Sequence, residues 1–358
     1  MIKYALIGCG RISTNHLKAA KLNNFEIIAL CDIVPSKMEL LLAKHNMQNN
    51  TSIKRYTNYL AMINENPDIN LISIATDSGK HAEIALDVIK KNINVIIEKP
   101  MAMSIQDANR IIEESEKHNV KVSVCHQNRF NIAVQRTRKA LEEGRFGKIS
   151  HASINVRWNR GKDYYDQASW RGKWSSDGGA LMNQCIHGID LLRWMLGNEI
   201  ESVYGITKRQ FHDYLECEDI GVAVVRFKNG SIATVEGTTN VYPKNLEETL
   251  YIFGQNGTVK LGGKSTNSID VWDFEDQKDN DAGFVEETSN VYGNGHTSLF
   301  YDVSDAIIHN RAPYITAYDG KRALELVLAI YLSSFSRKPV NFPLLECSST
   351  DFVGGFDK

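Results

Sequence analysis

The chain has few of the features that tie a protein to a metal framework, a membrane or a nucleic acid. Its six cysteines are scattered through 358 residues without a C-x-x-C pair, which argues against a zinc site and a dense disulfide framework. No apolar run reaches the roughly 18 residues of a membrane span, and no charged leader with a cleavage site precedes the first apolar segment. Lys and Arg total 41 against 43 Asp and Glu, a net charge of −2, so no basic field attracts nucleic acid. We expect a reduced, cytoplasmic, soluble protein without a metal.

Length and segment pattern predict two domains, because 358 residues exceed one ordinary core. Residues 1–125 alternate short apolar strands with amphipathic helices, which predicts an α/β domain with the doubly wound parallel sheet of a Rossmann fold. Residues 126–358 are rich in β-branched and aromatic strands, with two Asn-Gly turns that predict hairpins. This second part is predicted to be an α+β domain with a mostly antiparallel open sheet, ending in a weakly structured tail.

The opening stretch Gly8-Cys9-Gly10-Arg11-Ile12-Ser13 carries most of a dinucleotide-binding fingerprint, between an apolar strand and a helix. In G-x-G-x-x-G the first glycine makes the turn and the second lets the backbone approach a pyrophosphate; the third position here is serine. Asp32 ends the next strand, where a carboxylate can accept hydrogen bonds from ribose hydroxyls and repels a 2′-phosphate. The pattern favours NAD over NADP. The alternative is a chance glycine turn with Asp32 capping the following helix.

Glu98-Lys99-Pro100 directly follows another apolar strand, at the sheet edge where such folds bind ligands. A lysine there can hydrogen-bond a substrate hydroxyl and stabilise developing charge. From these residues alone, a sheet-edge salt bridge is an equal alternative. The peptide bond before Pro100 can be cis or trans.

Together with these two motifs, the stretch DGGALMNQCIH at residues 177–187 resembles the glucose-fructose oxidoreductase, inositol dehydrogenase and rhizopine-catabolism (Gfo/Idh/MocA) family over nearly the whole chain. The resemblance implies NAD(P)-dependent hydride transfer at a sugar or polyol carbon. It makes Lys99 the catalytic lysine and His187 the general acid/base. Asn183, where many relatives carry Asp, is expected one turn before His187 on a single helix over residues 179–196.

The same resemblance places further residues beside the cofactor. Trp170 and Arg171 match a pair that touches the cofactor in several relatives, and Thr76 matches a small polar residue after a strand. The residues predicted to bind NAD are Gly8, Gly10, Arg11, Ile12, Asp32, Thr76, His81, Glu98, Lys99, Gln127, Trp170 and Arg171.

The stretch RWNRGKDYYDQASWRGKW at residues 157–174 interleaves basic and aromatic side chains just before the helix of His187. Guanidinium groups can hold a phosphate or carboxylate, and aromatic rings can stack on a base or sugar. The alternative is an exposed loop of mixed composition. The predicted substrate-binding residues are Lys99, Arg157, Arg160, Asn183, Gln184 and His187.

Residues 170–192 and 240–257 resemble one subgroup of the family, the bacterial UDP-N-acetyl-2-amino-2-deoxy-D-glucuronate (UDP-GlcNAcA) 3-dehydrogenases of lipopolysaccharide and O-antigen synthesis. The resemblance implies NAD-dependent oxidation of the sugar C3 hydroxyl to a ketone. Some members retain NADH and reoxidise it with 2-oxoglutarate. Relatives form dimers and tetramers, and an open sheet face favours self-association, so we expect a homo-oligomer.

Three alternatives to this function remain. One is an NAD-dependent dehydrogenase of a simpler sugar or polyol such as inositol, which needs no clamp for a diphosphate. Another is an NADP-linked reductase, which Asp32 disfavours. The last is a non-catalytic sensor of NAD or sugar, against which the presence of both Lys99 and His187 argues.

Overall fold

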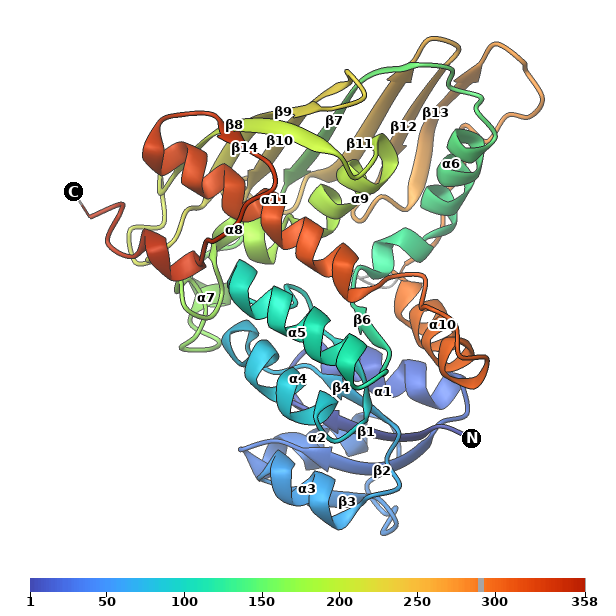
Figure 1. The fold of residues 1–358 in the computed structure, drawn as a ribbon, viewed down its shortest axis with the longest axis vertical. Coiled ribbons are helices and arrows are strands. Elements are labelled where there is room, and N and C mark those ends of the chain that lie inside the picture. Colours follow the sequence, from blue (N-terminus) through green and yellow to red (C-terminus); the bar gives the residue numbers. More distant parts are fainter. Residues whose placement is uncertain (289–292, 358) are drawn as a thin grey trace. The chain divides into compact units, whose positions relative to one another are not determined.

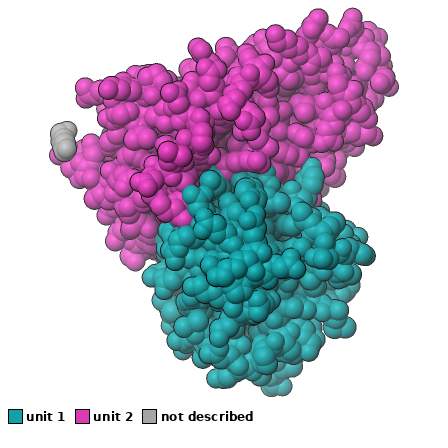
Figure 2. All heavy atoms as spheres, viewed as in Figure 1, with its two compact units in different colours: residues 1–102, 107–125, 296–321 teal, residues 103–106, 126–295, 322–358 magenta. Residues whose placement is uncertain are grey.

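The computed structural model describes residues 1–288 and 293–357, and contacts divide the chain into two compact units (Figure 2). Unit 1 contains residues 1–102, 107–125 and 296–321, and unit 2 contains residues 103–106, 126–295 and 322–358. The domain boundary predicted at residue 125 places residues 296–321 in the second domain. In the structure these residues make their contacts within unit 1. In the described ranges, no helix has both the length and the apolar character needed to cross a membrane.

Unit 1 is built on a six-stranded sheet in the order β3-β2-β1-β4-β5-β6, with every neighbouring pair parallel (Figure 1). This order confirms the predicted Rossmann sheet. The strands are β1 Lys3–Ile7, β2 Glu26–Cys31, β3 Lys54–Tyr56, β4 Leu71–Ile74, β5 Asn94–Ile97 and β6 Val122–Val124. The helices are α1 Ser13–Leu22, α2 Pro35–Lys44, α3 Tyr59–Glu65, α4 His81–Ile89, α5 Ile105–Lys117 and α10 Gly295–Ile308. The sequence analysis missed β3, because its three residues Lys-Arg-Tyr have no apolar pattern.

Unit 2 is built on an eight-stranded sheet in the order β13-β12-β11-β7-β10-β9-β8-β14 (Figure 1). Only the β7–β10 pair is parallel among these neighbours, which confirms the predicted, mostly antiparallel sheet. The strands are β7 Ile149–Arg157, β8 Ile200–Lys208, β9 Ile220–Phe227, β10 Ile232–Thr238, β11 Glu247–Gly254, β12 Gly257–Gly262, β13 Ser268–Phe274 and β14 Val340–Asn341. The helices are α6 Ile132–Glu142, α7 Lys162–Tyr165, α8 Gly179–Asn183, α9 Ile186–Leu196 and α11 Ala317–Ser336.

Helices cover one face of the unit 2 sheet. Gly188 of α9 lies directly against Ile154 and Val156 of β7, and Gly205 of β8 lies against Ile330 of α11. Side chains alternate between the two faces along each strand, so the opposite face carries the exposed apolar residues Tyr204, Ile206, Val222, Val224 and Ile232.

Two expectations from the sequence are wrong. The single helix over residues 179–196 is two helices, α8 and α9, separated by Gln184 and Cys185. Residues 347–357 of the predicted loose tail are structured, and residue 358 lies outside the described residues. Ser348 and Asp351 form a capping box on a short 3-10 helix, and the ring of Phe356 stacks on that of Trp174 at 6.1 Å.

Candidate functional site

The glycine turn of unit 1 has the shape required by a dinucleotide. Gly8 has a φ of +93°, and a Cβ there would lie 2.5 Å from the backbone of Ala75, so only glycine fits. Gly10 is exposed and a Cβ there would meet no atom within 4 Å, which leaves room for a pyrophosphate beside the backbone. The buried Ser13 hydroxyl donates to the Gly10 carbonyl at 2.5 Å, and this bond explains how serine serves at the third position.

Asp32 joins the glycine turn to the segment before α2. Its Oδ2 accepts the backbone N–H of Cys9 at 2.8 Å, and its Oδ1 accepts that of Val34 at 2.8 Å. Each carboxylate oxygen has a second lone pair, so Asp32 can still accept a ribose hydroxyl. The residues of the turn therefore fit NAD.

Lys99 follows β5 and is half-buried, and the Lys99–Pro100 peptide bond is cis. Hydrogen bonds fix the backbone before and after the Lys99 side chain. The Lys99 N–H donates to Glu98 Oε2 at 3.2 Å, and His81 Nδ1 lies 2.7 Å from the Pro100 carbonyl oxygen. Burial lowers the pKa of His81 and favours the neutral ring, which has a single N–H. The shorter of its two contacts places this proton on Nδ1, which donates to the Pro100 carbonyl. The hydrogen bond from Nδ1–H to the Pro100 carbonyl lets His81 support the loop that carries Lys99, whereas Nε2 lies 3.3 Å from the Thr76 carbonyl without donating to it.

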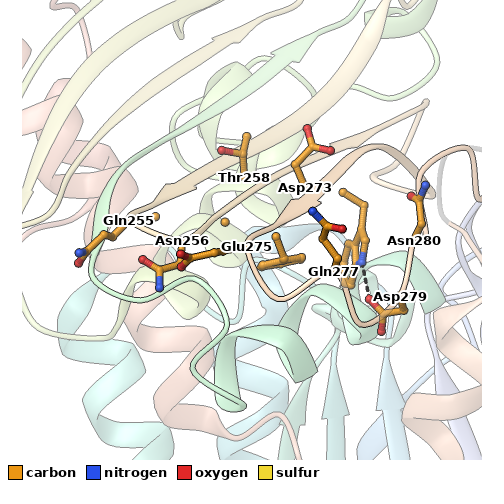
Figure 3. A pocket seen from close by; sticks show the side chains of 12 residues that line it. Gln255, Asn256, Thr258, Asp273, Glu275, Gln277, Asp279 and Asn280 are labelled. Atoms are coloured by element: carbon orange, nitrogen blue, oxygen red, sulfur yellow. Dashed lines mark hydrogen bonds between the residues drawn. The ribbon is translucent and has the colours of Figure 1, made fainter.

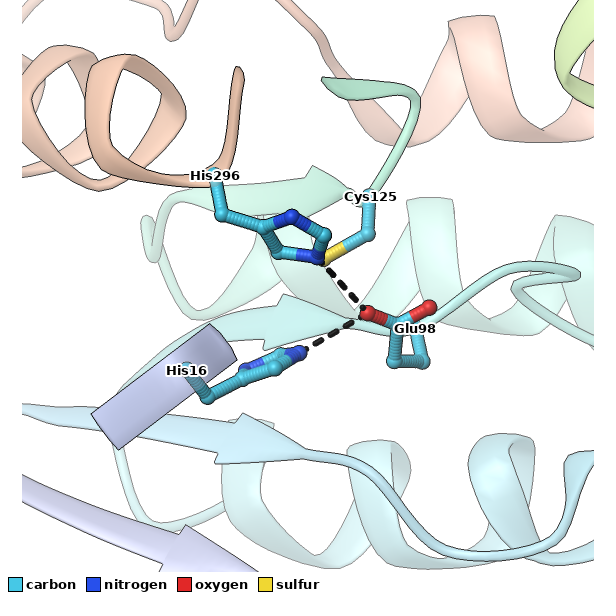
Figure 4. Close-up of side chains that lie close together, drawn as sticks. All are labelled: His16, Glu98, Cys125 and His296. Atoms are coloured by element: carbon cyan, nitrogen blue, oxygen red, sulfur yellow. Dashed lines mark hydrogen bonds and ion pairs between the residues drawn. The ribbon is translucent and has the colours of Figure 1, made fainter. Parts of the chain in front are cut away.

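Glu98 is buried among polar side chains that the sequence analysis did not connect with it (Figure 4). Its Oε1 accepts a hydrogen bond from His16 Nε2 at 2.8 Å and lies 3.4 Å from His296 Nε2. Burial by itself would raise the pKa of Glu98, but these hydrogen bonds outweigh it and hold the pKa well below its usual range. Since His296 is almost 200 positions further along the chain, no local pattern could have linked it to Glu98.

In unit 2, His187 is the second residue of α9 and is 7% exposed. Its ring is 6.0 Å from that of His126, in an edge-on arrangement. One turn further on, Asp190 accepts two hydrogen bonds of 2.7 Å from Arg129 and one of 2.9 Å from Arg193. Burial alone would raise the pKa of Asp190, but the guanidinium groups hold it well below its usual range. This buried ion cluster fixes α9 and the histidine on it.

Asn183 is the last residue of α8, and its side-chain amide donates to Asp177 Oδ1. The other oxygen of Asp177 accepts the Gly172 N–H at 2.7 Å. The sequence analysis quoted Asp177 as the first residue of a motif without giving it a role. The structure shows that it supplies a carboxylate directly beside Asn183.

The basic, aromatic stretch forms a compact cluster around Tyr164. The guanidinium carbons of Arg171 and Arg160 lie 4.0 Å and 5.0 Å from the centre of its ring. Gln184 accepts from Arg160 Nε at 3.1 Å and donates to the Tyr164 hydroxyl at 2.9 Å. In the part of the chain that the structure describes, neither arginine forms an ion pair with a carboxylate. Two positive charges beside one ring can therefore accept an anion. We call Arg160, Tyr164, Arg171 and Gln184 the arginine cluster.

Arg157 does not belong to the arginine cluster. It forms ion pairs with Glu236 at 2.5 Å and with Glu247 at 2.6 Å. Its neighbour Val156 packs against Gly188 of α9, so strand alternation directs Arg157 to the opposite face of the sheet. The structure thus separates Arg157 from His187, contrary to its predicted place in the substrate site.

The remaining predicted cofactor residues are divided between the units. Arg11 is exposed and Ile12 half-buried in the turn of unit 1. Gln127 is buried in a 3-10 helix of unit 2, and the Trp170 ring lies 4.8 Å from the guanidinium of Arg171. Their contact with NAD stays a prediction.

A concavity of about 1030 Å³ lies elsewhere in unit 2, around the β11–β12 turn and the end of β13 (Figure 3). Polar side chains such as Asn256, Asp273 and Gln277 line it. None of its lining residues is among those predicted for catalysis or binding, so it is not the candidate active site.

Comparison with known proteins finds a family match for each of the two parts of the chain. Residues 2–126 match the oxidoreductase family with an NAD-binding Rossmann fold, and residues 134–260 match the GFO/IDH/MocA C-terminal domain. A curated relative, myo-inositol 2-dehydrogenase of Thermotoga maritima, is 23% identical over 95% of this chain and 98% of its own length.

Two solved structures are more similar in sequence. The WlbA dehydrogenase from Bordetella pertussis, in complex with NADH and UDP-GlcNAcA, is 35% identical with a TM-score of 0.84, covering 96% of this chain and 99% of that one. The WlbA dehydrogenase from Chromobacterium violaceum, with the same two ligands, is 32% identical with a TM-score of 0.85, covering 96% of both chains. With its glycine turn, its Lys99 loop and its helix-covered open sheet, the chain belongs to the Gfo/Idh/MocA family of NAD-dependent oxidoreductases.

Proposed function

We propose that the protein oxidises the C3 hydroxyl of a UDP-N-acetylglucosaminuronate-type nucleotide sugar to a ketone, with NAD as the oxidant. The observation that carries this proposal is the arginine cluster, which lies in the same unit as His187 and offers two guanidinium groups that pair with no carboxylate of residues 1–288 and 293–357. A diphosphate or uronate supplies the negative charge that such a cluster binds, whereas inositol carries none. The two WlbA dehydrogenases with UDP-GlcNAcA add support through their 35% and 32% identity.

In the proposed mechanism, His187 takes the proton of the C3 hydroxyl as general base. Lys99 donates a hydrogen bond to the same oxygen and stabilises the negative charge that develops on it. Asn183, held by Asp177, orients the sugar hydroxyl. When bound, NAD accepts the two electrons and the hydrogen that leave the C3 carbon, so the products are the ketone, NADH and one proton.

The residues proposed to hold NAD are those of the glycine turn, with Asp32 on the ribose. Arg160, Arg171 and Gln184 are proposed to hold the diphosphate or the uronate. Arg157 is left out of this set because its guanidinium already pairs with two glutamates.

The proposal includes a homo-oligomer, a dimer or tetramer, formed through the exposed face of the unit 2 sheet. Five apolar side chains on three adjacent strands, from Tyr204 to Ile232, are between 44% and 62% exposed there, and such a patch marks an association surface. Sedimentation of the purified protein tests this, and a monomer at micromolar concentration would contradict it.

We further propose that the reaction takes place in the cytoplasm during lipopolysaccharide or O-antigen sugar synthesis. Six buried thiols fit a reducing compartment. The ketone is an activated position for a following amination, and 2-oxoglutarate is a proposed acceptor for regenerating NAD on the enzyme.

The deciding experiment compares NADH formation with UDP-GlcNAcA and with myo-inositol at equal concentrations. We expect turnover with the UDP-sugar only. Turnover with inositol alone would replace the proposed substrate by a simple polyol, and binding of NAD without turnover of either would favour a sensor. If NADH stays bound after one turnover, adding 2-oxoglutarate should restore repeated turnover.

A further inference from the structure

Four buried side chains from distant parts of unit 1 lie close together around Glu98, the residue before Lys99 (Figure 4). They are His16 from α1, Glu98 after β5, Cys125 after β6 and His296 from α10, and one potential ligand atom of each lies within 4.8 Å of the others. We call this group the Glu98 cluster. Imidazole, carboxylate and thiolate are all zinc ligands, so the cluster is either a metal site or a hydrogen-bonded network.

The distances favour the network. Zinc bonds of about 2.0–2.1 Å in a tetrahedron keep two nitrogen or oxygen ligands about 3.3 Å apart. His16 Nε2 and Glu98 Oε1 are only 2.8 Å apart, which is the length of a direct charge-assisted hydrogen bond.

The surroundings of the histidines and of the thiol agree with the distances. A metal-bound histidine almost always donates its second ring N–H to an acceptor, yet Nδ1 of both His16 and His296 is buried without a hydrogen-bond partner among the residues that the structure describes. If Nε2 carries the proton toward Glu98, each Nδ1 is a bare lone pair, which costs less to bury than an unpaired N–H. Burial, together with Glu98, raises the pKa of the Cys125 thiol well above its usual range, so without a metal ion the thiol is protonated and fits the hydrogen-bonded network.

The network ends at the backbone of the lysine. Glu98 Oε1 faces the two histidines, and Oε2 accepts the Lys99 N–H at 3.2 Å. The carboxylate thus joins α1 and α10 to the one backbone position that carries the lysine. We propose that Glu98, fixed by His16 and His296, is a positioning residue for Lys99 and acts without a metal ion. This inference rests on the catalytic role of Lys99 in the proposed function.

The first test is Glu98→Gln, which keeps the shape of the side chain and removes its charge. The matched control is Glu83→Gln, an exposed glutamate of α4 in the same unit. For Glu98→Gln we expect kcat to fall at least about tenfold, since small displacements of a catalytic group are costly. KM for NAD should change less than about twofold, in contrast to the predicted place of Glu98 beside the cofactor, because both carboxylate oxygens are engaged by His16, His296 and the Lys99 backbone. Equal kcat for both variants and the unsubstituted protein would overturn the proposal.

A pH profile separates positioning from general damage to the fold. Glu98→Gln removes a negative charge next to Lys99, so the alkaline limb of the kcat profile should move to lower pH. A merely structural defect would lower kcat equally at every pH, and that result would contradict the proposal. If Glu98→Gln does not fold, His296→Asn, which removes one donor to the carboxylate, is measured in the same way.

Metal analysis of the purified protein tests the second half of the proposal without any substrate. We expect less than about one metal ion per ten chains. Cys125→Ala should keep more than half of the original kcat, because a thiol is only a weak hydrogen-bond donor and contributes little to the network. Stoichiometric zinc that is lost in Cys125→Ala would overturn the network interpretation. If the unsubstituted protein oxidises no sugar, the proposed function fails. Metal content and nitrogen-15 NMR shifts still decide whether the Glu98 cluster is a metal site or a hydrogen-bonded network. In the network, His16 and His296 are expected as Nε2–H tautomers.

Discussion

The Glu98 cluster of unit 1 and the half-buried arginine cluster of unit 2 surround their charged groups in opposite ways. In unit 1, the ionised carboxylate of Glu98 receives its hydrogen bonds from histidines and from the Lys99 backbone, so the fold alone satisfies it. In unit 2, Arg160 and Arg171 share the ring of Tyr164 and pair with no carboxylate of the described residues. The difference teaches that the fold itself supplies the partners of Glu98, whereas the arginine cluster has charge to spare for the anionic ligand that we propose.

The largest expected effect tests the chemistry assigned to each unit. Lys99→Ala should lower kcat by about 1000-fold, because a donor to the developing oxyanion is lost, with NAD binding changed less than about threefold. His187→Asn should lower kcat by about 100- to 1000-fold through loss of the general base. Steady-state NADH formation and calorimetric titration with NAD measure the two quantities. Normal turnover by either variant would remove that residue from the mechanism.

The next effect compares a structural glycine of unit 2 with a glycine of unit 1 that is proposed to face the cofactor. Gly179 has a φ of +89°, and a Cβ there would overlap the buried Glu218 carboxyl group. Gly179→Ala should therefore destabilise the fold by at least about 3 kcal/mol.

Gly10→Ala, where a Cβ meets no atom, should change the free energy of unfolding by less than about 0.5 kcal/mol and weaken NAD binding about tenfold. Urea denaturation and NAD titration are the measurements. Unchanged NAD affinity in Gly10→Ala would mean that the cofactor does not approach this turn.

A third prediction concerns Glu248, a buried carboxyl group of unit 2 whose Oε1, unlike that of Glu98, has no donor among the described residues. Glu248 is 1% exposed, its Oε1 has no hydrogen-bond partner, and burial raises its pKa from 4.5 to about 8. The folded chain thus binds this proton more tightly than the unfolded chain, so stability is full below pH 4.5 and falls as the pH rises to about 8.

Glu248→Gln should remove this slope and raise the free energy of unfolding by about 2 kcal/mol at pH 8. Glu248→Met, which also lacks the charge, should share the flatter pH dependence. Denaturation at pH 5 and pH 8 gives both slopes, and a slope identical to that of the original protein would show that Glu248 is not the titrating group.

The smallest predicted effect compares two arginines on opposite faces of the unit 2 sheet. Arg160→Gln should raise KM for UDP-GlcNAcA about tenfold, which corresponds to about 1.4 kcal/mol. Arg157→Gln should leave this KM within about twofold and act on stability or self-association, since its partners are Glu236 and Glu247. The opposite order of effects would place the anion site on the other face of the sheet.

The sequence by itself determined the features that depend on short stretches of chain. The turn at Gly8 and Gly10, the position of Lys99 after a strand, and the Rossmann and open-sheet architecture follow from local patterns, because strand ends and glycine turns are set by neighbouring residues. The cofactor and the family follow from the same stretches.

Tertiary structure alone decided which of the distant polar groups meet. His296 reaches Glu98 only because residues 296–321 pack in unit 1, and Asp177 meets Asn183 because α8 ends before α9 begins. Arg157 and Arg160 are three positions apart, yet one pairs with glutamates and the other stacks on Tyr164. Composition showed that this segment is cationic and aromatic, but the face on which each side chain lies depends on strand register and packing, which bring together residues far apart in the chain.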